Sequence, residues 1–196
     1  MRLLKNLPID PFACEDYKIE HNLYRLKWTK KLIDEIKEPV LDIGTPNVFG
    51  QALAKYINID MDNTRGDLNF DGWVPDLLGK PVNKYRTVFC FEVIEHLLSP
   101  AMFLKRLRDF ITDDVVVYIT YPIRPHFMWT HIHFHEYDRR RFLYMLDYCG
   151  FKVEKYEWRW QRDYFTWRFI FSGIRPLLLR WWIGRARRQY YKLTLK

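Results

Sequence analysis

The stretch Val40–Gly50, with the sequence VLDIGTPNVFG, constrains the fold of this chain more than any other part of it. Its first four residues are mostly apolar, which is typical of a strand that is covered on both faces of a parallel sheet. Asp42 and Gly44 lie where such a strand would end, and the turn that follows can open a helix. In open parallel α/β sheets, ligands bind outside the carboxyl ends of the strands. This strand-to-helix turn is therefore the place to expect a cofactor.

The composition is that of one domain with an unevenly placed charge. The chain has 196 residues, of which 48% are apolar, and this is enough for a hydrophobic core. The net charge is +8, yet the segment 158–196 alone holds ten Lys and Arg residues and one acidic residue, Asp163. A nearly neutral body thus carries a basic tail. Such asymmetry indicates an anionic partner, which can be a membrane surface, nucleic acid or an acidic substrate.

The cysteines and the termini indicate a cytoplasmic protein. Cys14, Cys90 and Cys149 are odd in number and widely spaced, and the sequence has no CxxC pair. This pattern favours a reducing compartment and argues against a disulfide scaffold and a zinc knuckle. No apolar run resembles a signal peptide, and none reaches the ~18 residues of a membrane-spanning helix.

Strands alternate with helices along the chain, which predicts a parallel sheet with helices on both faces. Ser99 can cap one helix and Pro100 suits its first position, while Gly150 can end another helix at the C′ position. The expected domain plan is a core over 1–157 with an N-terminal helix, a basic aromatic insertion over 158–188, and a final core strand over 189–196. The expected strands are 40–43, 56–60, 66–70, 85–91, 115–120, 151–156 and 189–196, and the expected helices are 22–37, 48–55, one from Ser99-Pro100 onward, and 139–149.

Four motifs occur in an order that resembles class I S-adenosylmethionine-dependent methyltransferases, and in particular their type 11 and type 23 methyltransferase domains. The motifs are the strand and turn at 40–44, an acid closing the second strand at Asp60, the sequence FEVIEHL at 91–97 followed by Ser99-Pro100, and the strand opening GFKV at 150–153. The resemblance covers 38–156. It implies an α/β fold with a Rossmann-like class I methyltransferase sheet, mostly parallel with an antiparallel last strand.

The resemblance also implies S-adenosylmethionine as the cofactor and assigns residues to it. The turn from Asp42 to Gly44 would lie under the methionine part, and Asp60 would accept hydrogen bonds from the ribose hydroxyls, with Asp62 as the alternative. The sequence departs from the family at Pro46, where a second glycine is usual, because proline lacks a backbone N–H. The remaining implied cofactor contacts are Asn47 in the same loop, Asp67 and Leu68 beside the adenine, and Phe91 and Glu92 at the end of the fourth expected strand.

The string Glu92-Val93-Ile94-Glu95-His96 has a second interpretation. It looks like the metal site of small-RNA 2′-O-methyltransferases and of some quinone-pathway O-methyltransferases. Two carboxylates and an imidazole can hold a divalent ion, which can in turn bind two substrate hydroxyls. In the RNA enzymes a distal histidine completes the site, and His133 has the expected spacing from Phe142. We favour the metal-free interpretation, because the same string is common in methyltransferases without a metal.

Histidines gather after the fifth expected strand, where this fold builds its acceptor pocket. Methyl transfer from a sulfonium depends strongly on positioning, and an oxygen or nitrogen acceptor also needs a base, for which histidine is the usual choice. The four histidines of this segment are His126, His131, His133 and His135. The last three alternate, so in extended chain they face one way, and they are the catalytic candidates.

The segment 158–188 interleaves Trp, Phe, Ile and Leu with Arg. This composition is typical of an interfacial helix on anionic lipid. It is equally compatible with a helical pair packed on the sheet or on a second subunit of a homodimer. Runs of Leu and Trp favour lipid or protein contact over nucleic acid.

We therefore predict a cytoplasmic methyltransferase, peripheral at the inner membrane surface, that acts on a small-molecule, lipid-linked or glycan acceptor. Two alternatives stay open. One is a metal-assisted RNA 2′-O-methyltransferase, and the other is a non-catalytic binding protein with this fold.

Overall fold

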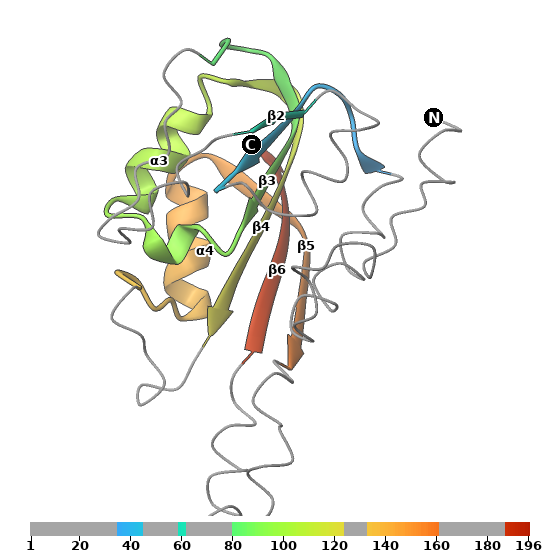
Figure 1. Ribbon diagram of the computed structural model, residues 1–196. Coiled ribbons are helices and arrows are strands. Elements are labelled where there is room, and N and C mark those ends of the chain that lie inside the picture. The colour runs from blue at the N-terminus through green and yellow to red at the C-terminus, as the bar shows by residue number, and fades with distance from the viewer. Residues whose placement is uncertain (1–34, 45–58, 62–79, 124–132, 161–186) are drawn as a thin grey trace, which may run out of the picture.

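The computed structural model describes residues 35–44, 59–61, 80–123, 133–160 and 187–196 (Figure 1). The helix expected at 48–55 and the strand expected at 66–70 lie outside these residues, as does most of the helix expected at 22–37. The interior of the basic aromatic insertion also lies outside them.

The described strands form one six-stranded sheet in the order β2-β1-β3-β4-β6-β5. β1, β2, β3 and β4 pair in parallel, and β6 is antiparallel to both β4 and β5. The predicted Rossmann-like sheet, mostly parallel with an antiparallel last strand, is therefore confirmed. The bounds are β1 Val40–Ile43, β2 Ile59–Met61, β3 Tyr85–Phe91, β4 Ile111–Ile123, β5 Phe151–Trp160 and β6 Arg187–Leu195.

Three strands are longer than the sequence pattern predicted. β4 extends beyond 115–120 at both ends, β5 continues past residue 156, and β6 begins before residue 189. β5 and β6 pair as far as Trp160 opposite Arg187. Because each added pair supplies backbone hydrogen bonds, pairing extends both strands into the first and last residues of the segment 158–188.

Two α-helices, α3 (Pro100–Leu107) and α4 (Arg139–Tyr148), lie together on one face of the sheet (Figure 1). α3 begins at Pro100 as expected, but the Ser99 side chain makes no capping bond, so that part of the prediction is wrong. The Ser99 carbonyl accepts from the Phe103 N–H instead, at 3.0 Å. None of the helices within the described ranges is long and apolar enough to cross a bilayer.

α4 is closed at both ends by local contacts. The Asp138 side chain accepts a hydrogen bond from the Arg141 N–H at 3.0 Å, which makes it the N-cap. Gly150 follows the helix at φ +83°, which confirms the predicted C′ glycine. The cap at Asp138 was not among the predicted helix signals.

The apolar faces of α3 and α4 pack on the sheet and form the core. Leu104 and Leu107 come from α3, and Phe142 and Leu146 come from α4. Each fully buried side chain of this size contributes about 1.5–3 kcal/mol relative to an exposed one. This packing fixes β3 and β4, and with them the chain that follows their carboxyl ends.

Candidate active site

The carboxyl ends of the parallel strands meet at one edge of the sheet. Ile43 at the end of β1 lies opposite Cys90 of β3, and Phe91 lies opposite Thr120 of β4. Gly44 therefore follows β1 at the level of Phe91. This edge is the one at which the sequence predicted a cofactor.

Gly44 makes a turn that no other residue can make without strain. Its φ is +81°, and a Cβ placed there would lie 2.2 Å from Cγ2 of Val93. Glycine is thus required both by the left-handed backbone and by the close approach of Val93. Asp42 is fully buried two residues before it. Pro46 and Asn47, which follow the turn, lie outside the described residues.

Asp60 lies in β2, which pairs with β1, and it is opposite Leu41 in the parallel register. The structure thus places it on the strand next to β1, where the resemblance predicts the ribose acceptor. Asp62, Asp67 and Leu68 lie outside the described residues.

Glu92 follows β3 in the left-handed region, at φ +56°. Its N–H donates to the Thr120 carbonyl at 3.0 Å, and Thr120 Oγ1 donates to Glu92 Oε1 at 2.9 Å. Arg188 Nε of β6 lies 3.2 Å from the other carboxylate oxygen. Left-handed backbone at a residue other than glycine costs about 1–3 kcal/mol, and such residues cluster at functional sites. Glu92 therefore joins the ends of three strands through one buried carboxylate.

Arg188 has a role that the sequence analysis missed. Its side chain is about 10% exposed and pairs with Glu92, whereas the sequence pattern assigned it to the basic tail. Only the antiparallel pairing of β6 with β4, which sets Arg188 opposite Pro122, brings it to this edge.

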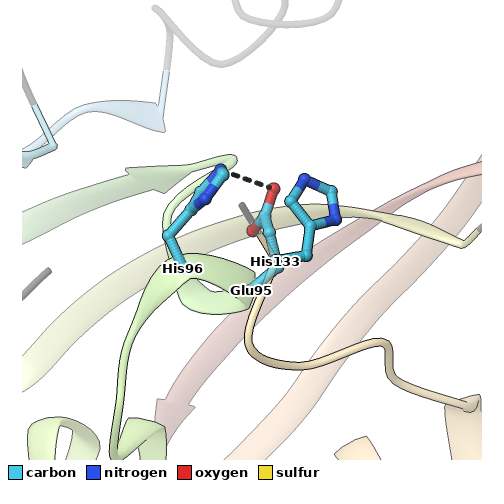
Figure 2. Close-up of side chains that lie close together, drawn as sticks. All are labelled: Glu95, His96 and His133. Carbon is cyan, nitrogen blue, oxygen red and sulfur yellow. Dashed lines mark ion pairs between the residues drawn. The ribbon is translucent and has the colours of Figure 1, made fainter. Parts of the chain in front are cut away.

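A second group of side chains lies close by. The 3-10 turn η4 (Ile94–His96) supplies Glu95 and His96, and the chain before α4 supplies His133 (Figure 2). One ligand atom from each residue lies within 4.8 Å of the other two. The His96 and His133 rings meet edge to face with their centroids 4.7 Å apart. The structure therefore brings together three of the four residues of the predicted metal set, while Glu92 binds Thr120 and Arg188.

Glu136 is a further residue of this group that the sequence analysis did not identify. Its Oε1 lies 2.8 Å from Nδ1 of His133, and the two side chains are 8% and 4% exposed. This segment is irregular and has no periodic pattern. The only signal in the sequence for the contact between His133 and Glu136 is their spacing of three residues.

His135 is held against η4. Its backbone N–H donates to the Glu95 carbonyl at 3.1 Å, and its ring nitrogen Nε2 lies 3.3 Å from the Leu98 carbonyl oxygen. Its ring also stacks on Tyr137. Burial, together with the nearby Glu95 carboxylate, raises the pKa of Tyr137 far above its ordinary value, so that hydroxyl stays neutral. His131 lies outside the described residues, and the catalytic roles of all three histidines remain predictions.

The sequence also matches the model of a known protein family. Residues 17–180 match the model of a family described as a methyltransferase domain. The chain belongs to this methyltransferase family. The match confirms the predicted class I S-adenosylmethionine-dependent methyltransferase, and it favours an enzyme over a non-catalytic binding protein.

Solved methyltransferase structures share the fold. An S-adenosylmethionine-dependent methyltransferase from Leishmania major is 10% identical, with 97% of this chain and 80% of that chain covered and a TM-score of 0.58. One from Aquifex aeolicus is 13% identical, with coverages of 85% and 89% and a TM-score of 0.52. A Haemonchus contortus phosphoethanolamine N-methyltransferase in complex with S-adenosylhomocysteine is 11% identical, with coverages of 88% and 52% and a TM-score of 0.56. A search of curated proteins gave no match.

Proposed function

We propose that this enzyme transfers a methyl group from S-adenosylmethionine to a small-molecule, lipid-linked or glycan acceptor. The observation that carries the proposal is the position of the Gly44 turn, which follows β1 at the edge of the sheet where the carboxyl ends of β1 and β3 meet. In open parallel α/β sheets this edge is where ligands bind, which supports a cofactor at the turn.

Residues at the ends of three strands would hold the cofactor. The backbone at Gly44 would lie under its methionine part, and the Asp60 carboxylate would accept hydrogen bonds from the ribose hydroxyls. Phe91 offers an apolar ring at the end of β3. The cofactor, when bound, supplies a methyl group already activated by a sulfonium. The protein then has to orient the acceptor and remove its proton.

His133 is the better-placed base of the two catalytic candidates within the described ranges, His133 and His135. Its ring lies in a buried group with two further polar side chains, and Glu136 orients it. His135 is less suited, since its Nε2 contacts the Leu98 carbonyl oxygen. An acceptor bound beyond the end of β3 would place its proton near the His133 ring.

Isothermal titration calorimetry with S-adenosylmethionine and S-adenosylhomocysteine tests the proposal. We expect Asp60→Ala to weaken binding about 10-fold or more, because a charge-assisted hydrogen bond contributes ~1.5–3 kcal/mol. Asp113→Ala is the matched control, since this exposed carboxylate lies near the amino end of β4, away from the site. The absence of binding to the wild-type protein would refute the proposed function. Unchanged affinity in Asp60→Ala would move the ribose contact to Asp62.

A second candidate function is metal-assisted methyl transfer, with the 2′-hydroxyl of RNA as the acceptor. It is favoured by the convergence of Glu95, His96 and His133 within 4.8 Å. A carboxylate and two imidazoles suit divalent ions such as Mn²⁺, Fe²⁺ or Zn²⁺, and these residues fit such an ion. A bound ion would supply Lewis-acid activation of a hydroxyl.

Titration with Mn²⁺, followed by the electron paramagnetic resonance signal of the free ion, separates the two candidates. The metal-assisted candidate predicts 1:1 binding that is lost in His133→Ala and retained in His135→Ala, whose ring contacts Leu98 instead of the group. Weak binding that is equal in both variants would reject it.

We also propose that the segment 158–188 holds the enzyme at an anionic membrane surface. Its support is the sequence, in which Arg residues alternate with Trp, Phe and Leu. Flotation with phosphatidylserine vesicles should show binding that is lost when Arg180 and Arg185 are changed to Gln. The same change at Arg140 and Arg141, which are exposed on α4, is the control. Flotation that responds equally to both sets would point to nonspecific charge.

A further inference from the structure

The contact between His133 and Glu136 determines which ring nitrogen carries a proton. A carboxylate only accepts hydrogen bonds, so at 2.8 Å from Glu136 Oε1 the Nδ1 atom of His133 must be the donor. A neutral histidine ring has a single N–H. In the neutral ring the proton therefore lies on Nδ1, and Nε2 presents a lone pair.

That lone pair faces the rest of the group. Figure 2 shows one nitrogen of the His133 ring turned toward the Glu95 carboxylate and the other turned away from it. Because Nδ1 contacts Glu136, the nitrogen that faces Glu95 is Nε2. His96 Nε2 lies 3.8 Å from Glu95 Oε1 on the other side of the same carboxylate.

This arrangement places the Glu95 carboxylate oxygens close to the unprotonated Nε2 of His133, in a region with little water. The side chains of Glu95, His96 and His133 are 2%, 5% and 4% exposed. A carboxylate oxygen and an imidazole lone pair that face each other repel, and burial strengthens the repulsion. A proton or a metal ion between them would remove it, and Nε2 of His133 is the atom available to bind either.

We infer that Glu136 is a positioning residue that holds His133 as the Nδ1-protonated tautomer and so directs the lone pair of Nε2 toward Glu95. Whether Nε2 takes the acceptor's proton or binds a metal rests on the proposed function. The tautomer of His133 does not depend on that proposal. In metal sites a carboxylate behind a histidine fixes the ring in this way, and in proton transfer it sets which nitrogen can act as the base.

The tautomer can be read directly by nuclear magnetic resonance of protein labelled with ¹⁵N-histidine. The spectra would be recorded near pH 8.5, about two units above the ordinary histidine pKa. His133→Asn identifies the His133 signals by their loss. We expect Nδ1 of the wild-type protein to show the shift of a protonated nitrogen and Nε2 that of an unprotonated one.

Two variants at Glu136 separate orientation from mere packing. Glu136→Gln has a similar size, but its amide can either accept from Nδ1 or donate to it, so this variant should no longer fix a single tautomer. Glu136→Leu has a similar size and offers no acceptor, so it should lose the Nδ1-protonated pattern. A proton on Nε2 in the wild-type protein would overturn the inference, and so would an unchanged pattern in a folded Glu136→Leu.

The wild-type spectrum decides which ring nitrogen of His133 carries the proton, even if Glu136→Leu fails to fold. Because the measurement uses the protein without cofactor or acceptor, it is independent of S-adenosylmethionine binding. A failure of the calorimetric test would therefore reject the proposed function and leave the tautomer standing.

Discussion

Gly44→Ala is the substitution whose effect can be worked out most directly from the structure. Alanine at φ +81° adds about 1–2 kcal/mol of backbone strain. Its Cβ would also lie 2.2 Å from Val93 Cγ2, on a side chain that is 1% exposed and cannot move aside. Overpacking of this kind costs about 1–3 kcal/mol. The two effects together lower the free energy of unfolding by about 2–5 kcal/mol.

Thermal and urea unfolding measure this loss, and a second glycine supplies the control. For a chain of this length, each kcal/mol shifts Tm by about 2–4 °C. Gly150 has φ +83°, but a Cβ there would meet only the Arg108 guanidinium, at the end of a flexible side chain. Gly150→Ala should therefore cost only the backbone strain of about 1–2 kcal/mol.

A double-mutant cycle isolates the contact with Val93. In a Val93→Ala background the clashing methyl group is gone, so Gly44→Ala should cost only the backbone strain there. The coupling energy of the cycle should be about 1–3 kcal/mol. An equal cost of Gly44→Ala in both backgrounds, or a cost no larger than that of Gly150→Ala, would refute this description of the turn.

Three further predictions concern charge, pH and capping. Arg188→Met should lower the free energy of unfolding by about 3–5 kcal/mol in urea unfolding, because it leaves the Glu92 carboxylate buried without its cation; a loss below 1 kcal/mol would contradict a buried pair. Burial raises the pKa of Tyr191 to about 12. In the unfolded chain the tyrosine hydroxyl ionises near pH 10. Its contribution to the free energy of unfolding is therefore complete below pH 10 and falls by ~1.4 kcal/mol per pH unit between pH 10 and 12. Urea midpoints against pH should show a shallower decline in Tyr191→Phe, and an equal decline would contradict the shift. Asp138→Ala should cost about 1 kcal/mol by removing the α4 cap, whereas Ser99→Ala, which removes no side-chain capping bond, should cost less in the same assay.

The sequence was sufficient for features that depend on a few consecutive residues. The apolar run at 40–43 and Gly44 predicted β1 and its turn, because burial and positive φ leave a clear pattern in residue types. Gly150 predicted the end of α4 for the same reason. The order of such local signals was enough to identify the sheet and the family.

The tertiary structure decided what depends on residues far apart in the chain. Arg188 reaches Glu92 only because β6 pairs with β4, and the length of β5 and β6 follows from their mutual pairing. His133 joins Glu95 only because the chain before α4 is held against η4. Side-chain chemistry at these positions is visible in the sequence, but the partner of each group is set by long-range packing and strand register, which leave no local pattern.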